Sequence, residues 1–73
     1  MNDVVKEILS RRDPSGMYVI LADAKAKELV EEFRGWGVVY DEVGDTIIVR
    51  TKSRSVAEKL AKALARRGLL KVE

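Results

Sequence analysis

The residues that could do chemistry in this chain are acids and bases, because its 73 residues include neither histidine nor cysteine. Without histidine the chain lacks the commonest general base, the commonest metal ligand and the usual pH switch. Without cysteine it has no thiol nucleophile, zinc–thiolate site, disulfide or redox motif. Carboxylates are therefore the remaining candidates for catalysis or metal binding.

The carboxylates do not have a spacing that predicts an active site. Glu31 and Glu32 lie on the exposed side of a predicted helix, whereas Asp41, Glu42 and Asp45 cluster at a predicted hairpin tip. A calcium or magnesium site needs several convergent oxygen ligands, and no EF-hand spacing occurs. We therefore expect no enzymatic activity, no metal and no cofactor.

The basic residues are concentrated near the C-terminus. Residues 50–71 hold eight bases against one acid, a net charge of +7, whereas residues 23–45 hold three bases against seven acids, a net charge of −4. The eight bases are Arg50, Lys52, Arg54, Lys59, Lys62, Arg66, Arg67 and Lys71. Clustered bases can contact nucleic-acid phosphates. The alternative is that Lys59, Lys62 and Arg66 form the solvated face of a helix, with the last bases favoured by the helix dipole.

The best-placed anion contacts are Arg50, Lys52 and Arg54, which lie at a predicted strand-to-helix junction. A helix N-terminus there would favour bound anions. Gly35-Trp36-Gly37 is not a phosphate loop, because it follows a predicted helix and enters a strand. Trp36 is predicted to pack at the helix exit, and the alternative is an exposed anchor for a partner.

The element that must position these residues is the uncharged apolar run from Met17 to Ala22. A half-exposed strand would alternate apolar and polar residues, so this run predicts a central strand that is covered on both faces. Three further strands are predicted at 38–43, 46–51 and 69–72, and Gly44-Asp45 forms a tight hairpin turn between the middle two.

Apolar residues at helical spacing predict helices at 2–12, 24–34 and 54–67. The N-cap candidates are Asn2 or Asp3, Asp23, and Ser53 or Ser55. Gly35 is expected to end the second helix in the left-handed conformation, and Gly68 is expected to end the third. The Asp13–Gly16 segment is expected to end the first helix as a turn.

With right-handed crossovers, this order of elements predicts an α+β fold. It is a ferredoxin-like β-α-β-β-α-β domain with a four-stranded antiparallel sheet of order 4-1-3-2 and an additional N-terminal helix. Residues 1–73 form one domain, with the N-terminal helix at 1–12 and the ferredoxin-like core at 17–72.

The predicted helix-covered face of the sheet carries Val19, Leu21, Val38, Tyr40, Ile47, Val49, Leu70 and Val72. The second face carries Tyr18, Ile20, Val39, Val43 and Ile48, with Asp41, Thr46 and Arg50. A tight turn places Tyr40 opposite Val49, whereas a four-residue loop would shift the pairs by two and preserve the faces. We expect Asp41 to form a surface ion pair with Arg50. Five apolar groups on one face would be unusual for a monomer, so something should cover them.

The N-terminal helix is the expected cover, because its apolar stripe has no other partner. The stripe consists of Val4, Val5, Ile8 and Leu9. Full burial of each is worth about 1.5–3 kcal/mol, which would offset the cost of ordering a short helix. We expect this helix to dock on the second sheet face or along its edge, and the alternative is a homodimer formed through the same surface.

The strand sequences resemble those of the RNA-recognition-motif family over residues 17–72. Met17–Ala22 resembles the family's first-strand signature, with Tyr18 in the position of a base-stacking aromatic. Thr46–Thr51 followed by Ala57-Glu58-Lys59 resembles its third strand entering the second helix. Thr46 and Ile48 stand where that strand has stacking aromatics. The resemblance implies a ferredoxin-like fold and RNA bound by stacking of bases on aromatic rings.

The predicted function is a stable small scaffold without a biochemical activity of its own. A content of 36% charged residues fits either a hyperthermophile protein or a computationally designed one. The first alternative is a nucleic-acid-binding domain that uses Arg50, Lys52, Arg54 and Tyr18. The second is a homodimer or protein-interaction module that uses the second sheet face. No apolar run approaches the ~20 residues of a membrane helix, and no signal core is present, so we expect a cytoplasmic protein without a membrane partner.

Overall fold

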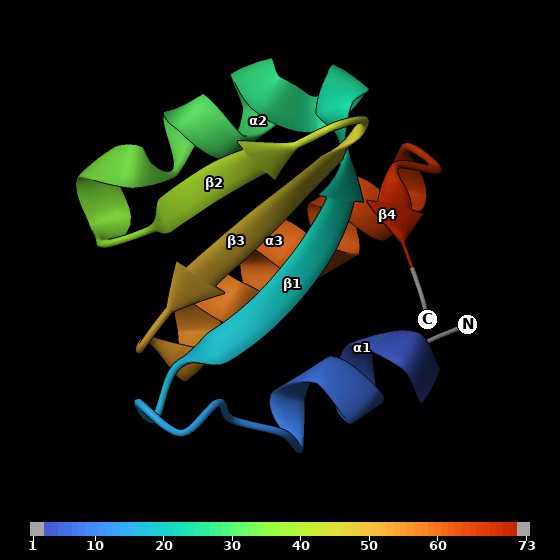
Figure 1. The fold of residues 1–73 in the computed structure, drawn as a ribbon. Coiled ribbons are helices and arrows are strands. Elements are labelled where there is room, and N and C mark those ends of the chain that lie inside the picture. The colour runs from blue at the N-terminus through green and yellow to red at the C-terminus, as the bar shows by residue number, and fades with distance from the viewer. Residues whose placement is uncertain (1–2, 72–73) are drawn as a thin grey trace.

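A computed structural model describes the backbone of residues 3–71 and the side chains of residues 5–71. The helices are α1 (Asp3–Leu9), α2 (Lys27–Glu32) and α3 (Arg54–Arg66), and short 3₁₀ helices η1 (Ala24–Ala26) and η2 (Arg34–Trp36) flank α2 (Figure 1). The strands are β1 (Tyr18–Asp23), β2 (Val39–Val43), β3 (Thr46–Thr51) and β4 (Leu70–Lys71). No helix in this part of the chain has the length and apolar character needed to cross a bilayer.

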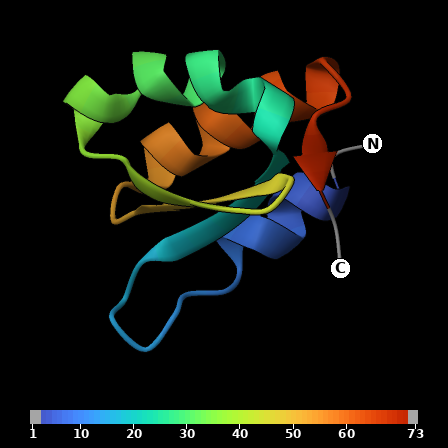
Figure 2. The same cartoon turned by 45° about the horizontal axis from the view of Figure 1, so that its top comes forward.

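The strands form one antiparallel sheet of order β2-β3-β1-β4, which is the predicted 4-1-3-2 order counted from the other edge. The predicted pairing of Tyr40 with Val49 in the β2–β3 hairpin is confirmed. Figure 2 shows α2 and α3 lying together on one side of the sheet. The chain is thus an α+β protein in which two helices cover one face of a four-stranded sheet.

The hydrophobic core lies between that covered face and the helices. Its largest fully buried side chains are Tyr18, Val30, Ile47, Val49, Leu60 and Leu64, together with Ile20 and Thr51. Every buried side-chain nitrogen and oxygen atom in the described part of the chain has a hydrogen-bond partner. The core therefore leaves no described buried polar side chain without compensation for its lost hydration.

The face prediction for β1 is wrong. The buried residues of β1 are Tyr18, Ile20 and Ala22. Val19 and Leu21, which were expected under the helices, are half-buried on the opposite face. Ile20 lies opposite the buried Val49 of β3, so both face the helices. Because β1 is apolar at almost every position, its pattern does not select a face, and the pairing register with β3 makes the choice.

The opposite face of the sheet, called the open face here, has no helix over it in Figures 1 and 2. Its apolar residues are Val19, Leu21, Val39, Val43 and Ile48, which lie beside Asp41, Thr46, Arg50 and Lys71. The prediction for the β2 and β3 residues of this face is confirmed. Val39 and Val43 are 54% and 59% exposed, so the open face is an apolar surface in contact with solvent.

The two ends of α3 follow the sequence signals. Of the two candidate caps, Ser53 is the N-cap, and its hydroxyl accepts a 3.2 Å hydrogen bond from the Val56 N–H. At the other end the Leu69 N–H donates to the Leu64 carbonyl at 2.9 Å. Gly68 has a φ of +70°, which glycine adopts without a Cβ clash. These contacts form a Schellman-type end that turns the chain into β4.

The prediction that Gly35 ends the second helix in the left-handed conformation is wrong. α2 ends at Glu32, and η2 extends the helical path to Trp36 through a 3.0 Å hydrogen bond from the Trp36 N–H to the Phe33 carbonyl. Gly37 has the positive φ, +90°. A 3₁₀ turn satisfies its carbonyls with i→i+3 bonds, so the reversal occurs two residues later than a simple helix end predicts.

Candidate functional site

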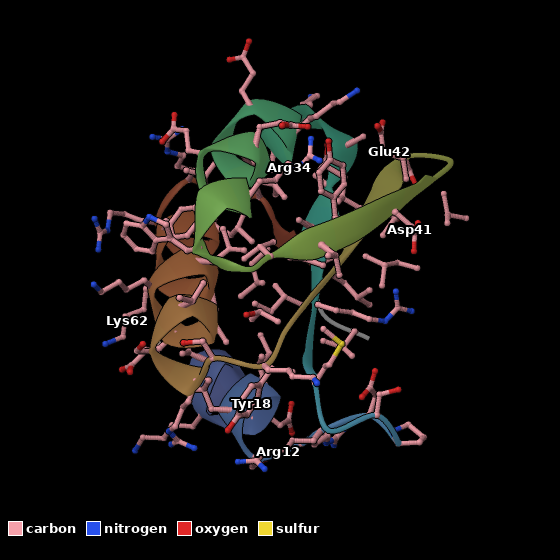
Figure 3. All side chains as sticks on the ribbon, turned by 90° about the vertical axis from the view of Figure 1, so that its left-hand side faces the viewer. Arg12, Tyr18, Arg34, Asp41, Glu42 and Lys62 are labelled. Carbon is pink, nitrogen blue, oxygen red and sulfur yellow. The ribbon has the colours of Figure 1, made fainter. Side chains whose placement is uncertain are left out.

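Tyr18, the predicted stacking aromatic, lies in the core with only 1% of its surface exposed. The Arg12 Nη2 donates a 3.0 Å hydrogen bond to its hydroxyl, and the guanidinium lies 5.1 Å from the ring centroid. Figure 3 shows the two side chains meeting at the bottom of the view. The hydrogen bond from Arg12 lowers the pKa of Tyr18 from its ordinary value of 10.0, although burial acts in the opposite direction. The ring therefore has no face available for a nucleic-acid base.

Arg50 lies on the open face between two carboxylates. Its Nη1 is 3.2 Å from Asp41 Oδ2, which confirms the predicted ion pair, and its Nε is 3.8 Å from Asp13 Oδ2. Asp13 also anchors the turn before β1, because its Oδ1 accepts a 2.8 Å hydrogen bond from the Met17 N–H. The charge of Arg50 is thus directed at neighbouring acids.

Arg54 connects the start of α3 to the end of α1. Its Nη1 donates a 3.3 Å hydrogen bond to the Leu9 carbonyl. Lys52 is exposed in the connection between β3 and α3. The four predicted nucleic-acid contacts therefore do not form one site, because Tyr18 is in the core and Arg50 is on the open face.

α1 packs at the edge of the sheet against β1 and α3 rather than over the open face (Figure 1). Val5 and Leu9 are buried in the common core, and Ile8 is partly buried against it. The side chain of Val4 lies outside the described residues. Among the described residues, β4 pairs with Leu21 and Ala22 of β1.

Other described carboxylates form separate contacts at the surface. Glu31 accepts a hydrogen bond from the Tyr40 hydroxyl, which lowers the pKa of Glu31 and raises that of Tyr40. Lys71 Nζ lies 3.2 Å from Asp45 and lowers the pKa of that carboxyl. Within residues 5–71, no three acids converge as metal ligands would.

Lys27 and Glu42 join η1–α2 to the edge strand β2. Their charged atoms are 3.0 Å apart, and this contact raises the pKa of Lys27. A cleft of about 680 Å³ lies beside this strand. Its lining residues are Arg34, Gly37, Val38, Val39, Tyr40, Asp41 and Glu42, of which Figure 3 labels Arg34, Asp41 and Glu42. The cleft follows the unpaired edge of the sheet and has no buried acid or base.

Trp36 is more exposed than the predicted packing role at the helix exit implies. It contacts Phe33 edge-to-face, with ring centroids 5.5 Å apart at 70°, yet 55% of its surface is exposed. The Lys59 Nζ lies over the indole, 5.3 Å from the ring centroid. The flanking Gly35 and Gly37 are the sequence signal for an aromatic at an irregular helix end. The pairing with Lys59 depends on how η2 and α3 pack.

No protein-family model, curated protein or solved structure matches the chain.

Proposed function

We propose that the chain is a non-enzymatic scaffold domain with a ferredoxin-like fold. The observation that carries this proposal is the separation of the core from the ionisable groups. Among the side chains of residues 5–71, the buried ones are apolar apart from Thr51 and the hydroxyl of Tyr18. Catalysis generally uses a desolvated acid, base or nucleophile with a perturbed pKa in a cleft. The acids and bases of residues 5–71 lie instead outside this buried core, at the surface.

The ferredoxin-like assignment is supported by the strand order and by the crossovers through α2 and α3. The regular caps, short loops and contiguous core are typical of computationally designed proteins and of thermostable natural ones. Both origins are consistent with a chain whose main property is a stable fold.

Urea denaturation of the chain alone tests the scaffold proposal. We expect a single cooperative transition, with coincident curves from circular dichroism and from the fluorescence of Trp36, because α1, α2, α3 and the four strands contribute to one core and Trp36 contacts Phe33, which packs against it. A chain that remains partly unfolded until a ligand or partner is added would contradict the proposal, since a scaffold must fold without either.

A second candidate is a protein-interaction or homodimer module that uses the open face. The exposure of Val39 and Val43 beside the half-buried Leu21 and Ile48 favours it, because contiguous exposed apolar groups often mark contact surfaces. Sedimentation over a range of concentrations should then show self-association that Val39→Lys abolishes and the distant exposed change Lys25→Gln preserves. A monomer at every concentration would exclude the homodimer.

A further inference from the structure

We propose that Trp36 and the basic outer side of α3 bind single-stranded nucleic acid, with a base stacked on the indole and phosphates held by Lys59, Lys62 and Arg66. This site is distinct from the strand-to-helix junction expected from the sequence. The proposal goes beyond the scaffold function, which requires no ligand.

The indole of Trp36 is positioned as a stacking surface. Phe33 supports it edge-to-face, and Lys59 lies over the ring. Because 55% of Trp36 is exposed, a large part of the residue is accessible to a partner. The 3₁₀ hydrogen bonds of η2 hold its backbone, so a bound base would not have to order this segment.

Three bases of α3 continue from the indole along one side of the helix. Lys59, Lys62 and Arg66 have spacings of three and four residues, which place them next to one another on a helix surface. At 1.5 Å per residue they cover roughly 10 Å of the helix axis. All three are exposed, and Figure 3 shows Lys62 extending away from α3.

The charge balance of α3 favours an anionic partner. Residues 54–67 carry five bases and one acid. That acid, Glu58, lies 2.9 Å from Lys62, whereas Lys59 and Arg66 take part in none of the ion pairs among residues 5–71. Trp36 lies within the acidic segment 23–45, so the positive charge of the proposed site comes from α3.

An exposed aromatic beside a row of bases matches the chemistry of a single strand. Single-stranded nucleic acids bind through aromatic rings that stack on bases and basic groups that follow the phosphates. In a duplex the bases are stacked on one another and cannot reach the indole. An acidic peptide would match the charge but does not supply the flat base that Trp36 can stack on.

Trp36 is the single tryptophan of the chain, so its fluorescence reports directly on the site. A 12-nucleotide oligothymidylate added at low salt should quench this fluorescence saturably. With about three phosphates neutralised, log K should fall against log salt with a slope of about −2. Polyglutamate and a duplex of the same length should quench much less at equal charge concentration.

Variants measured by anisotropy of a labelled oligothymidylate separate stacking from charge. Trp36→Leu should weaken binding about tenfold or more. Lys59→Gln and Arg66→Gln should each make the slope of log K against log salt less negative, by the amount expected for the loss of nearly one phosphate contact. Lys25→Gln, an exposed change on η1, is the matched control and should leave affinity unchanged. The urea midpoint of each variant verifies that it is folded.

The proposal is overturned by absence of binding at low salt, by binding that leaves Trp36 fluorescence unchanged, or by polyglutamate quenching equal to that of the oligonucleotide. Equal losses of affinity for the oligothymidylate in Lys25→Gln and Lys59→Gln would also overturn it. In each case a cooperative urea transition of the parent chain would leave the scaffold proposal standing, so the two failures are distinguishable.

Discussion

Ile47 and Ile48 are identical neighbours on β3, yet they belong to two very different environments. Ile47 is completely buried against the helices, whereas Ile48 is half-buried on the open face. Both faces of the sheet contain β-branched and aliphatic residues, so residue type does not distinguish them. What differs is the cover that α2 and α3 supply to one face only.

The largest effect expected from this comparison is on stability. Ile47→Ala should lower the free energy of unfolding by about 2–5 kcal/mol, because it removes buried methyl groups and leaves a cavity. Ile48→Ala should cost less than half as much, since its side chain already contacts water. Urea denaturation of the two variants measures both values, and equal losses would show that the open face is covered in solution.

The edge helix α1 extends the comparison to a third region. Val5 is buried against the core and its neighbour Lys6 is exposed. Val5→Asp should destabilise the chain by more than about 2 kcal/mol, because a carboxyl would be buried without a partner. Lys6→Asp, at the adjacent position, should change stability by much less. If Val5→Asp unfolds at the same urea concentration as the parent, α1 does not dock as described.

The smallest effect concerns the surface ion pairs. Lys62 lowers the pKa of Glu58 from its ordinary value of 4.5, and Lys71 does the same for Asp45 from 3.8. A lowered folded-state pKa means that the unfolded chain binds more protons in this range. The stabilisation is therefore complete above about pH 5 and is lost as the pH falls through the folded-state pKa values.

Urea midpoints measured from pH 7 to pH 3 should therefore decline below pH 5. Glu58→Gln should show a shallower decline than the parent, because it removes one of the shifted groups. Glu28→Gln removes an exposed carboxyl that is in none of the described ion pairs and serves as the control. An identical pH profile for Glu58→Gln and the parent would show that the Lys62–Glu58 contact does not persist in solution.

Much of the local structure could be predicted, because short segments contain their own signals. Gly44-Asp45 between two alternating strands predicted the β2–β3 hairpin with its register. Gly68 after an apolar stripe predicted the end of α3. The Asp41–Arg50 contact followed from that register, since cross-strand neighbours on one face lie within reach of each other.

The candidate site was less predictable. Tyr18 was assigned to the wrong face because β1 is apolar on both sides, and the contact of Arg50 with Asp13 was not predicted. Trp36 and Lys59 are far apart in the sequence, and nothing local indicates that they meet.

The sequence alone determined which segments become helices and strands, where most of them end, and that histidine and cysteine chemistry is absent. These properties depend on caps, turn residues and periodicity, which act within a few residues. Only the tertiary structure decided which face of β1 is buried, that α1 lies at the sheet edge, and that Trp36 remains exposed beside the bases of α3. Those outcomes depend on pairing and packing between distant segments, where a shift of one residue moves a side chain to the other face of the sheet.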